Sequence, residues 1–333
     1  MFRVGLVGAG FMGRFHAAGW ARTPATLAAI FAADYNQMHA LCESTGARPV
    51  DSLDALLDAV DVVDICTPTH LHHGMALKAA AAGKHIICEK PLARTPQQAA
   101  EMIAACRAAG VILLPAHVVR FFPQYALAKQ TVDEGAVGRV AIVRLTRVSS
   151  GPAWAADSWF TDFDKSGGMM LDLMLHDFDY ARWVAGEVES VFAKSVGAHK
   201  PGERQDYGLA ILRHTGGALS NVEGGWAYPP PMFRTALEIA GDGGLIECPA
   251  EGTAPLAVYR RTTGGDDGAI TGVPTSPLAE DPYTTQIKHF YDVIANNAPP
   301  RVTAEDGLAA LRIAFAALES AQTGRRVRLE EVQ

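Results

Sequence analysis

The opening residues of the chain constrain its fold more than any other feature. An apolar run, residues 3–7, leads directly into the sequence Gly8-Ala9-Gly10-Phe11-Met12-Gly13, which has the G-x-G-x-x-G spacing of a turn between a strand and a helix. In such a turn the first glycine permits the tight bend, the second lets a pyrophosphate approach the backbone, and the third lets helix and strand pack closely. Because the helix begins at this turn, its N-terminus faces the phosphates. The pattern predicts a dinucleotide-binding domain.

An acidic residue stands where this kind of domain recognises ribose. Asp34 ends the second predicted strand, about 20 residues beyond the last glycine of the turn, where a carboxylate accepts both adenosine ribose hydroxyls. The same charge repels the 2′-phosphate of NADP, and Tyr35 is not the arginine that such a phosphate favours. We therefore predict NAD as the cofactor, with Arg22 and Arg48 as the side chains that leave NADP open.

Strand and helix patterns alternate in the first third of the chain, and the rhythm changes after Gly138. Predicted strands at residues 3–7, 27–33, 62–66, 85–88 and 111–115 alternate with predicted helices at residues 12–21, 37–45, 53–59, 72–82 and 96–109. This order implies a parallel sheet covered on both faces. Later runs at residues 140–148, 190–196, 208–213, 218–225 and 235–240 predict one mainly antiparallel sheet, followed by helices at 283–296 and 304–322. Residues 262–268 are expected to form an exposed loop.

A length of 333 residues favours two domains. We predict an α/β protein with an N-terminal Rossmann domain, a doubly wound parallel sheet, over residues 1–118. Residues 119–333 are predicted to form an α/β domain for substrate binding and oligomerisation, with a large, mainly antiparallel sheet. This assignment leaves open that the last helix packs against the Rossmann domain.

Charge and cysteine content argue against several classes of protein. A formal net charge of -7 without a basic tract leaves nothing for a nucleic-acid backbone to bind, so we expect a small-molecule partner. We expect no signal peptide, because the first strand lies at the start of the sequence without a basic and apolar leader. No apolar run reaches the length of about 18 residues that a membrane span needs. The scattered cysteines are typical of reduced thiols in the cytoplasm. They are Cys42, Cys66, Cys88, Cys106 and Cys248.

Two motifs follow strands at the carboxyl edge of the predicted parallel sheet, where nucleotides bind in open α/β folds. The first is Cys66-Thr67-Pro68-Thr69-His70-Leu71-His72, whose structural alternative is an ordinary loop that caps the next helix. Its histidines lie on one turn and point in different directions, so we predict no metal site. The second is Glu89-Lys90-Pro91, in which the proline keeps the lysine out of helical geometry. It predicts a lysine beside the nicotinamide, although a solvated surface lysine is the usual alternative.

The stretch 166–183 predicts a buried helix opened by glycines, because it is apolar nearly all round. Asp172, His176 and Asp179 fall at positions i, i+4 and i+7, which places them in one polar stripe. Buried ionisable groups need partners, and a ligand supplies them in a binding site. Alcohol oxidation needs a base for the hydroxyl proton, a task that suits a neutral Lys or His. A structural histidine beside a carboxylate is the alternative.

Together these motifs resemble those of the glucose-fructose oxidoreductase, inositol dehydrogenase and rhizopine-catabolism (Gfo/Idh/MocA) oxidoreductases. The resemblance covers nearly the whole chain, in the segments GLVGAGFMGRFHA, CTPTHLHH, AAGKHIICEKPLA, RFFPQY, GGMMLDLMLHDFDYARW and TAEDGLAALRIAFAALESAQTGRRVRL. It is most specific in EKP combined with an Asp four residues before a His on the second-domain helix. MLDLMLHDFD and the strand end at Asp34 look especially like the inositol dehydrogenase branch.

The resemblance implies an activity and a role for each of three residues. Members mostly oxidise or reduce one carbon of a sugar, cyclitol or related polyol, and often assemble as homodimers or homotetramers through the open sheet of the second domain. Carried over by motif, Lys90 would bind the reacting hydroxyl and tune proton transfer, Asp172 would orient the substrate and His176, and His176 would be the principal acid/base. The chain departs from many members at Thr69 and Met174, which leaves the substrate open.

The predicted site residues form two sets. The cofactor set is Gly8, Gly10, Phe11, Met12, Gly13, Asp34, Tyr35, Thr67, Pro68, Thr69, His72, Glu89 and Lys90. The substrate set, chosen for directional donors and flat aromatic faces, is Lys90, His117, Arg120, Trp154, Asp172, His176 and Tyr283.

We predict an NAD(H)-dependent dehydrogenase or reductase that acts on a secondary alcohol or ketone of such a polyol. Two other functions stay open: a redox-neutral NAD-dependent glycoside hydrolase, and a non-catalytic ligand-binding or regulatory protein on the same fold. The presence of Lys90, Asp172 and His176 argues against the last, because binding alone needs no acid/base set.

Overall fold

The computed structural model of the protein describes residues 1–151, 159, 162–196, 207–229, 232–248 and 280–332. The chain forms two compact units. One comprises Met1–Phe122 and Ser276–Ala309, and the other comprises Pro123–Thr275 and Ala310–Gln333. Each unit has its own sheet.

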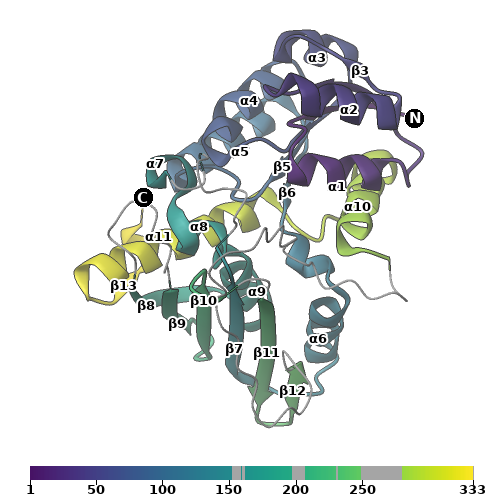
Figure 1. The fold of residues 1–333 in the computed structure, drawn as a ribbon. Coiled ribbons are helices and arrows are strands. Elements are labelled where there is room, and N and C mark those ends of the chain that lie inside the picture. The colour runs from purple at the N-terminus through teal and green to yellow at the C-terminus, as the bar shows by residue number, and fades with distance from the viewer. Residues whose placement is uncertain (152–158, 160–161, 197–206, 230–231, 249–279, 333) are drawn as a thin grey trace. The chain divides into compact units, whose positions relative to one another are not determined.

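The first unit contains a sheet of six parallel strands in the order β3-β2-β1-β4-β5-β6 (Figure 1). The strands are β1 (Arg3–Val7), β2 (Thr26–Phe31), β3 (Arg48–Pro49), β4 (Val62–Ile65), β5 (His85–Glu89) and β6 (Leu113–Ala116). This is the strand order of a Rossmann fold, with the order reversing beside β1. The predicted doubly wound parallel sheet is confirmed.

Helices connect these strands and cover both faces of the sheet. They are α1 (Phe11–Trp20), α2 (Tyr35–Thr45), α3 (Leu53–Ala59), α4 (Thr69–Ala81), α5 (Pro96–Ala109), the 3-10 turn η1 (Val118–Phe121) and α10 (Pro282–Asn296). Side-chain oxygens of Asp34, Ser52 and Thr95 accept backbone N–H groups at three helix starts, which satisfies donors that the helix itself leaves unpaired. Figure 1 shows α4 and α5 on one side of the strands and α1 and α10 on the other.

The core of the first unit follows the alternation of side chains along β1. Val4 and Leu6 point to one face, where they pack with residues of α1, α2 and α10. Gly5 points to the opposite face, where a Cβ would lie 2.5 Å from Leu56 of α3. Close packing of α3 on the sheet therefore requires the small residue at this position.

Residues 276–309 belong to the first unit, whereas the sequence analysis assigned them to the second domain. The physical reason is the apolar face of α10. Ile287 and Phe290 are completely buried and join the same core as Val4, and a Cβ at Gly19 of α1 would lie 2.9 Å from Ile287. The closing helices are therefore shared between the units rather than confined to the second.

The second unit contains a sheet of seven strands in the order β12-β11-β7-β10-β9-β8-β13. The strands are β7 (Val140–Ser149), β8 (Val188–Val196), β9 (Tyr207–His214), β10 (Leu219–Gly225), β11 (Phe233–Gly241), β12 (Leu245–Cys248) and β13 (Val327–Arg328). Only the β7–β10 pair runs parallel among these described strands. The predicted mainly antiparallel sheet is confirmed.

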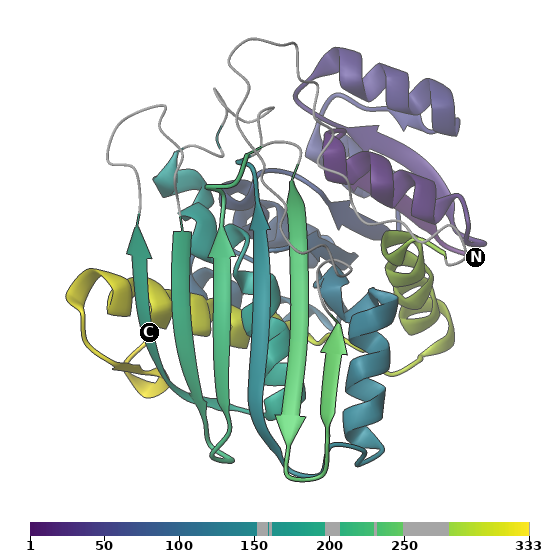
Figure 2. The same cartoon turned by 60° about the horizontal axis from the view of Figure 1, so that its bottom comes forward.

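Helices of the second unit lie on one face of this sheet. They are α6 (Pro123–Asp133), α7 (Phe163–Ser166), α8 (Gly168–Asp172), α9 (Leu175–Ala185), most of α11 (Ala304–Thr323) and the 3-10 turn η4 (Leu329–Glu331). Helices α8 and α9 contact β7, β9 and β10. Figure 2 shows the opposite face, which the described helices of this unit leave open. Helix α6 and the short strands β3, β12 and β13 were not predicted from the sequence. The loop predicted at residues 262–268 lies outside the described residues.

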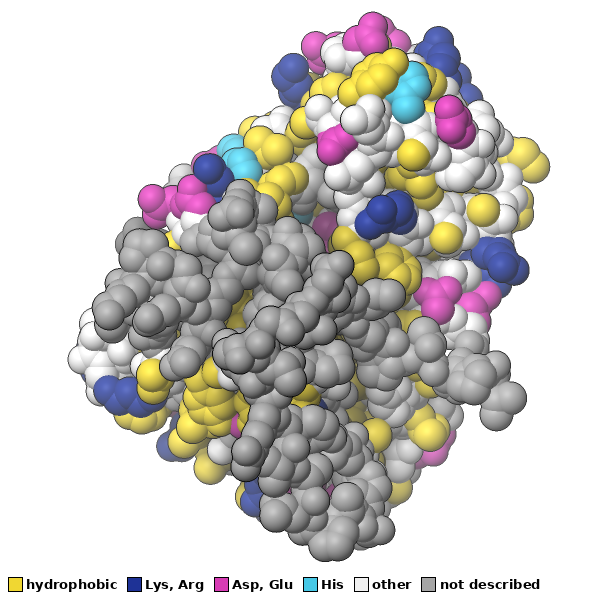
Figure 3. Space-filling view, in the orientation of Figure 1, with side chains coloured by type: hydrophobic (Ala, Val, Ile, Leu, Met, Phe, Trp, Pro, Cys, Tyr) yellow, Lys and Arg dark blue, Asp and Glu magenta, His cyan; other side chains and the backbone are white. Residues whose placement is uncertain are grey.

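The described helices include no candidate membrane span, and the described side chains on the face drawn in Figure 3 form no basic patch. None of the described helices is both long and apolar enough to cross a membrane. On the face shown in Figure 3, described Lys and Arg side chains are interspersed with Asp and Glu.

Candidate active site

The glycine turn between β1 and α1 is built to receive a phosphate group. Gly8 has a φ of 101°, a conformation that favours glycine. A Cβ at Gly13 would lie 2.1 Å from the carbonyl oxygen of Gly8, so this packing also requires glycine. Gly10 is the N-cap of α1, and no described atom lies within 4 Å of the position of a Cβ there. Open space beside the N–H groups of a helix start fits the pyrophosphate of a dinucleotide.

Asp34 stands between the second strand and α2, where its side chain has a local structural task. Its Oδ1 accepts the backbone N–H of Gln37 at 2.9 Å, and its Oδ2 accepts the side-chain amide of Gln37 at 3.0 Å. Asp34 is exposed, so its remaining lone pairs face solvent. Tyr35 is 65% exposed and packs against His39 with tilted rings whose centroids are 4.0 Å apart. The fixed, exposed carboxylate fits ribose hydroxyls.

The loop after β4 lies beside the glycine turn. A Cβ at Gly8 would lie 2.5 Å from the carbonyl oxygen of Cys66, which follows that strand. His72 is buried, with Nε2 2.8 Å from the carbonyl oxygen of Thr67 and Nδ1 2.9 Å from that of Pro91. Burial lowers the pKa of His72, so its neutral ring donates to one carbonyl at a time. His72 therefore spans the loops that follow β4 and β5.

Glu89 and Lys90 leave the sheet at the end of β5. Glu89 is 5% exposed, and its Oε2 accepts the backbone N–H of Lys90 at 2.9 Å. The Lys90–Pro91 peptide bond is cis, and Lys90 is half-buried. The glycine turn, the loop after β4 and Lys90 thus share the carboxyl edge of one parallel sheet. The first unit brings these predicted residues together as the sequence analysis expected.

The prediction of a single helix over residues 166–183 was wrong. Helix α8 ends at Asp172 and α9 begins at Leu175. Between them the backbone N–H of Met174 reaches back five residues to the carbonyl of Met169 at 3.1 Å, a bond of π-helical spacing. Asp172 therefore ends one helix and His176 lies in the first turn of the next, so the two are not an i, i+4 pair on one regular helix. Both residues are half-buried.

The packing of Met174 gives a physical reason for this break. A Cβ at Gly224 of β10 would lie 2.3 Å from Met174 Cγ, and a Cβ at Gly208 of β9 would lie 3.0 Å from its Sδ. Two strand glycines therefore make room for the long side chain of Met174. The irregular turn between α8 and α9 accommodates the Met174 side chain against these strands. The helical periodicity of the sequence does not reveal this packing.

A buried ion pair near these residues was missed by the sequence analysis. Asp177 accepts two hydrogen bonds from Arg147 of β7, from Nε at 2.7 Å and from a terminal nitrogen at 3.0 Å. Burial raises the pKa of Asp177, and the Arg147 guanidinium opposes that rise. The pair fastens α9 to the sheet one residue after His176. The only sequence signal was an arginine inside an apolar strand.

The other predicted substrate residues have varied surroundings. Arg120 is 1% exposed and donates to Asp306 at 3.1 Å and to the carbonyl oxygen of Arg301 at 2.9 Å. Tyr283 packs against Phe15 with ring centroids 4.8 Å apart. Both arrangements lie inside the first unit, and each gives its side chain a structural task. His117 is completely buried, and Trp154 lies outside the described residues.

The two units resemble known domains along most of the chain. Residues 2–117 match the description "Oxidoreductase family, NAD-binding Rossmann fold", and residues 125–247 match the "GFO/IDH/MocA C-terminal domain". The chain belongs to the Gfo/Idh/MocA oxidoreductase family. The recognition from sequence motifs is thereby confirmed, and with it an NAD-binding oxidoreductase.

Several relatives of this Gfo/Idh/MocA protein have been named or solved. It is 30% identical to "Myo-inositol 2-dehydrogenase" of Thermotoga maritima, over 99% of this chain and 99% of the relative. It is 29% identical to "Inositol 2-dehydrogenase" of Rhizobium meliloti, over 98% of each chain. A structure of levoglucosan dehydrogenase with NADH and levoglucosan has a TM-score of 0.83 and 28% identity, covering 98% of this chain and 99% of that one.

Proposed function

We propose that the protein is an NAD⁺-dependent dehydrogenase that oxidises a secondary alcohol of a sugar, cyclitol or related polyol. The observation that carries the proposal is the carboxyl edge of the first sheet. The glycine turn at Gly8 to Gly13, called the phosphate cradle below, follows β1 at this edge, and Lys90 follows β5. Dinucleotides bind at this edge in open α/β sheets. Relatives named for inositol and levoglucosan support a polyol as the substrate class.

Three side chains are proposed to act on the alcohol. NAD⁺, when bound, supplies the acceptor for the hydride that leaves the carbinol carbon. Lys90 binds the reacting hydroxyl, Asp172 orients the substrate and His176, and His176 takes the hydroxyl proton as general base. The oxidised carbon becomes a ketone while the proton passes to His176. His176 is half-buried in the first turn of α9, and an imidazole is the side chain most often used as a general base.

Arg120 and Tyr283 are not included in the proposed substrate site. The guanidinium of Arg120 is occupied by Asp306 and a backbone carbonyl, and the ring of Tyr283 packs among phenylalanines. Phe11 and Met12 remain proposed cofactor contacts, because they occupy the first turn of α1 beside the phosphate cradle.

A screen of polyols and aldoses with NAD⁺ tests the proposed reaction. Net formation of NADH with at least one compound is expected, whereas cleavage of a glycoside without net NADH would support the redox-neutral hydrolase instead. Binding without either reaction would favour a regulatory protein. The screen should include myo-inositol and levoglucosan, because both stand in the names of relatives.

Replacing Asp34 is expected to change the choice of cofactor. In Asp34→Ala the affinity for NAD should fall by about tenfold to a hundredfold, because hydrogen bonds from ribose to a charged group are lost. Affinity for NADP should rise, because the charge that repels its 2′-phosphate is gone. Fluorescence titration of NADH and NADPH measures both.

The matched control separates the cofactor effect from the helix cap. Asp34 also caps α2 through Gln37, and Asn caps helices about as well as Asp. Asp34→Asn should therefore keep the wild-type melting temperature while still relaxing the discrimination against NADPH. Wild-type preference for NADPH in the same titration would contradict the assignment.

We also propose that the open face of the second sheet joins copies of this chain into a homodimer or homotetramer. Strands β8, β9 and β10 present Phe192, Leu209, Ile211 and Leu219 on that face, each between 39% and 47% exposed. Phe192 lies directly opposite Ile211 in the β8–β9 pairing. A contiguous apolar patch on a sheet face is typical of a protein–protein interface.

A charge at the centre of this patch is expected to break the assembly. Ile211→Glu should reduce the molar mass from light scattering toward that of one chain, because a carboxylate buried in an interface lacks a partner. Leu127→Glu is the control, since Leu127 is a comparably exposed apolar residue on α6 and should leave the mass unchanged. A monomeric wild-type protein, or an Ile211→Glu oligomer of unchanged mass, would refute the proposed interface.

A further inference from the structure

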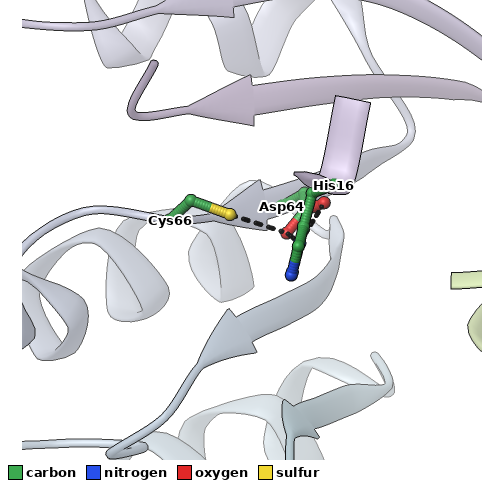
Figure 4. A group of neighbouring side chains, drawn as sticks. All are labelled: His16, Asp64 and Cys66. Atoms are coloured by element: carbon green, nitrogen blue, oxygen red, sulfur yellow. Dashed lines mark hydrogen bonds and ion pairs between the residues drawn. The ribbon is translucent and has the colours of Figure 1, made fainter. Parts of the chain in front are cut away.

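A buried cluster around His16 has no place in the proposed chemistry. His16 lies in α1 and is completely buried. Its Nδ1 lies 2.9 and 3.0 Å from the two carboxylate oxygens of Asp64 on β4, and its Nε2 lies 3.1 Å from Oε1 of Glu89 on β5. Figure 4 shows His16 and Asp64 facing one another, with Cys66 beside them. One imidazole therefore lies between two buried carboxylates.

Each carboxylate in the cluster has a further donor. Trp20 Nε1 donates to Asp64 at 2.7 Å, and the backbone N–H of Lys90 donates to Oε2 of Glu89 at 2.9 Å. Glu89 thus uses one oxygen for His16 and the other for the backbone of Lys90. The contacts form a continuous chain from α1 through β4 and β5 to Lys90.

The geometry calls for a proton on His16. A neutral imidazole carries only one N–H, whereas both ring nitrogens here face carboxylate oxygens. Burial lowers the pKa of His16, but the charge of Asp64 and the other contacts outweigh burial, so that its pKa lies well above the ordinary range. A buried imidazolium compensates two buried carboxylates that would otherwise repel each other.

The thiols and the second buried histidine beside the cluster are neutral. Burial raises the pKa of the Cys66 and Cys88 thiols, and burial lowers the pKa of His72. Of these groups, His16 is therefore the one whose protonation balances Asp64 and Glu89. Loss of that proton would leave the two carboxylates without compensation.

A metal ion is the competing interpretation of the same side chains. Ligand atoms of His16, Asp64 and Cys66 all lie within 4.8 Å of one another, and these residue types suit zinc. Yet both nitrogens of His16 and both oxygens of Asp64 already have hydrogen-bond partners. The raised pKa of Cys66 also opposes the thiolate that a metal requires. A proton fits the cluster better than a metal.

We propose that His16 is a positioning residue for Lys90: held between Asp64 and Glu89, it fixes the Glu89 carboxylate that binds the Lys90 backbone. The proposal rests on the proposed catalytic role of Lys90. Because α1 begins at the phosphate cradle, the same side chain ties the helix that receives the cofactor to the strand end that carries the lysine. The orientation of Lys90 thus depends on a residue that touches neither substrate nor cofactor.

The test compares His16→Gln, Glu89→Gln and the double variant with the wild type. Glutamine at position 16 offers no positive charge, whereas glutamine at position 89 keeps a carbonyl oxygen for the Lys90 N–H. The readout is the rate at which acetic anhydride labels Lys90 in the cofactor-free protein, measured by peptide mass spectrometry. Lys78, which is exposed on α4, serves as the internal reference.

In His16→Gln the labelling rate of Lys90 relative to Lys78 is expected to change by at least about threefold. Turnover should fall by about tenfold to a hundredfold, because the lysine is displaced from the reacting hydroxyl. The double variant should resemble Glu89→Gln alone, because His16 acts through Glu89. If His16→Gln does not fold, Glu89→Gln by itself should change Lys90 labelling.

Three results would overturn the proposal. One is wild-type labelling of Lys90 in every folded variant, which would leave His16 a purely structural role. Another is fully additive effects in the double variant. The third is one zinc per wild-type chain, measured by elemental analysis and lost in His16→Gln. A polyol screen without NADH formation would refute the proposed reaction, whereas the labelling of Lys90 would still test the positioning role of His16. The outcomes of the two proposals are therefore distinguishable.

Discussion

His176→Ala is expected to lower turnover by about two to four orders of magnitude, the usual contribution of a general base. The hydroxyl proton must leave as the carbinol carbon loses hydride, and the variant has no imidazole to accept it. The affinity for NAD should change little, because the proposed cofactor contacts lie in the first unit and His176 lies in the second. Steady-state kinetics and NADH titration measure the two quantities.

A second histidine provides the control for this variant. His73 is half-buried, its Nε2 lies 2.8 Å from a carboxylate oxygen of Glu101, and it belongs to neither proposed set of site residues. His73→Ala should keep turnover within about threefold of the wild type, since a partly exposed pair contributes little. Wild-type turnover in His176→Ala would remove this residue from the mechanism.

Arg147→Met is expected to lower the free energy of unfolding by about 3–5 kcal/mol, the usual effect of removing one partner of a buried ion pair. The Asp177 carboxylate is completely buried and would be left without its bidentate partner. Urea denaturation at pH 8 measures the loss. Arg147→Met/Asp177→Leu should recover most of it, because no charge then stays buried.

The sign of the pH dependence follows from the raised pKa of Asp177. A carboxyl group whose pKa is raised in the folded state contributes stability below its unfolded pKa, and that contribution is lost as pH rises through the folded pKa. Burial already raises the pKa of Asp177 in the wild type, and loss of Arg147 removes the charge that opposes this rise. The destabilisation in Arg147→Met should therefore be smaller at pH 5 than at pH 8.

Another arginine of β7 supplies a matched control. Arg144 lies on the same strand as Arg147 and pairs with Glu238, but its side chain is 55% exposed. Arg144→Met should therefore lower the free energy of unfolding by less than about 1 kcal/mol. An equal loss in both variants would contradict the importance assigned to burial.

The first unit could be predicted from sequence because its signals are local. The turn at Gly8 to Gly13 and the alternation of apolar strands with helices depend only on near neighbours in the chain. Asp34 could be placed for the same reason, since it follows a strand closely and caps the next helix. Each feature carries its own steric or hydrogen-bonding requirement, which a single sequence displays.

Other features depend on partners far away in the sequence. The break between α8 and α9 accompanies the packing of Met174 against Gly224, and helical periodicity carries no trace of that contact. The assignment of α10 to the first unit depends on its packing against α1. His16 looked like one more helical residue, because its partners lie 48 and 73 positions further along the chain.

Transfer of hydrogen from substrate to cofactor tests the central claim most directly. The compound that yields the most NADH in the screen would be deuterated at its carbinol carbon and incubated with NAD⁺ and the wild-type protein. Mass spectrometry should find one deuterium in the NADH formed, together with the ketone product. NADH without deuterium, or a cleaved glycoside with no net NADH, would contradict a dehydrogenase.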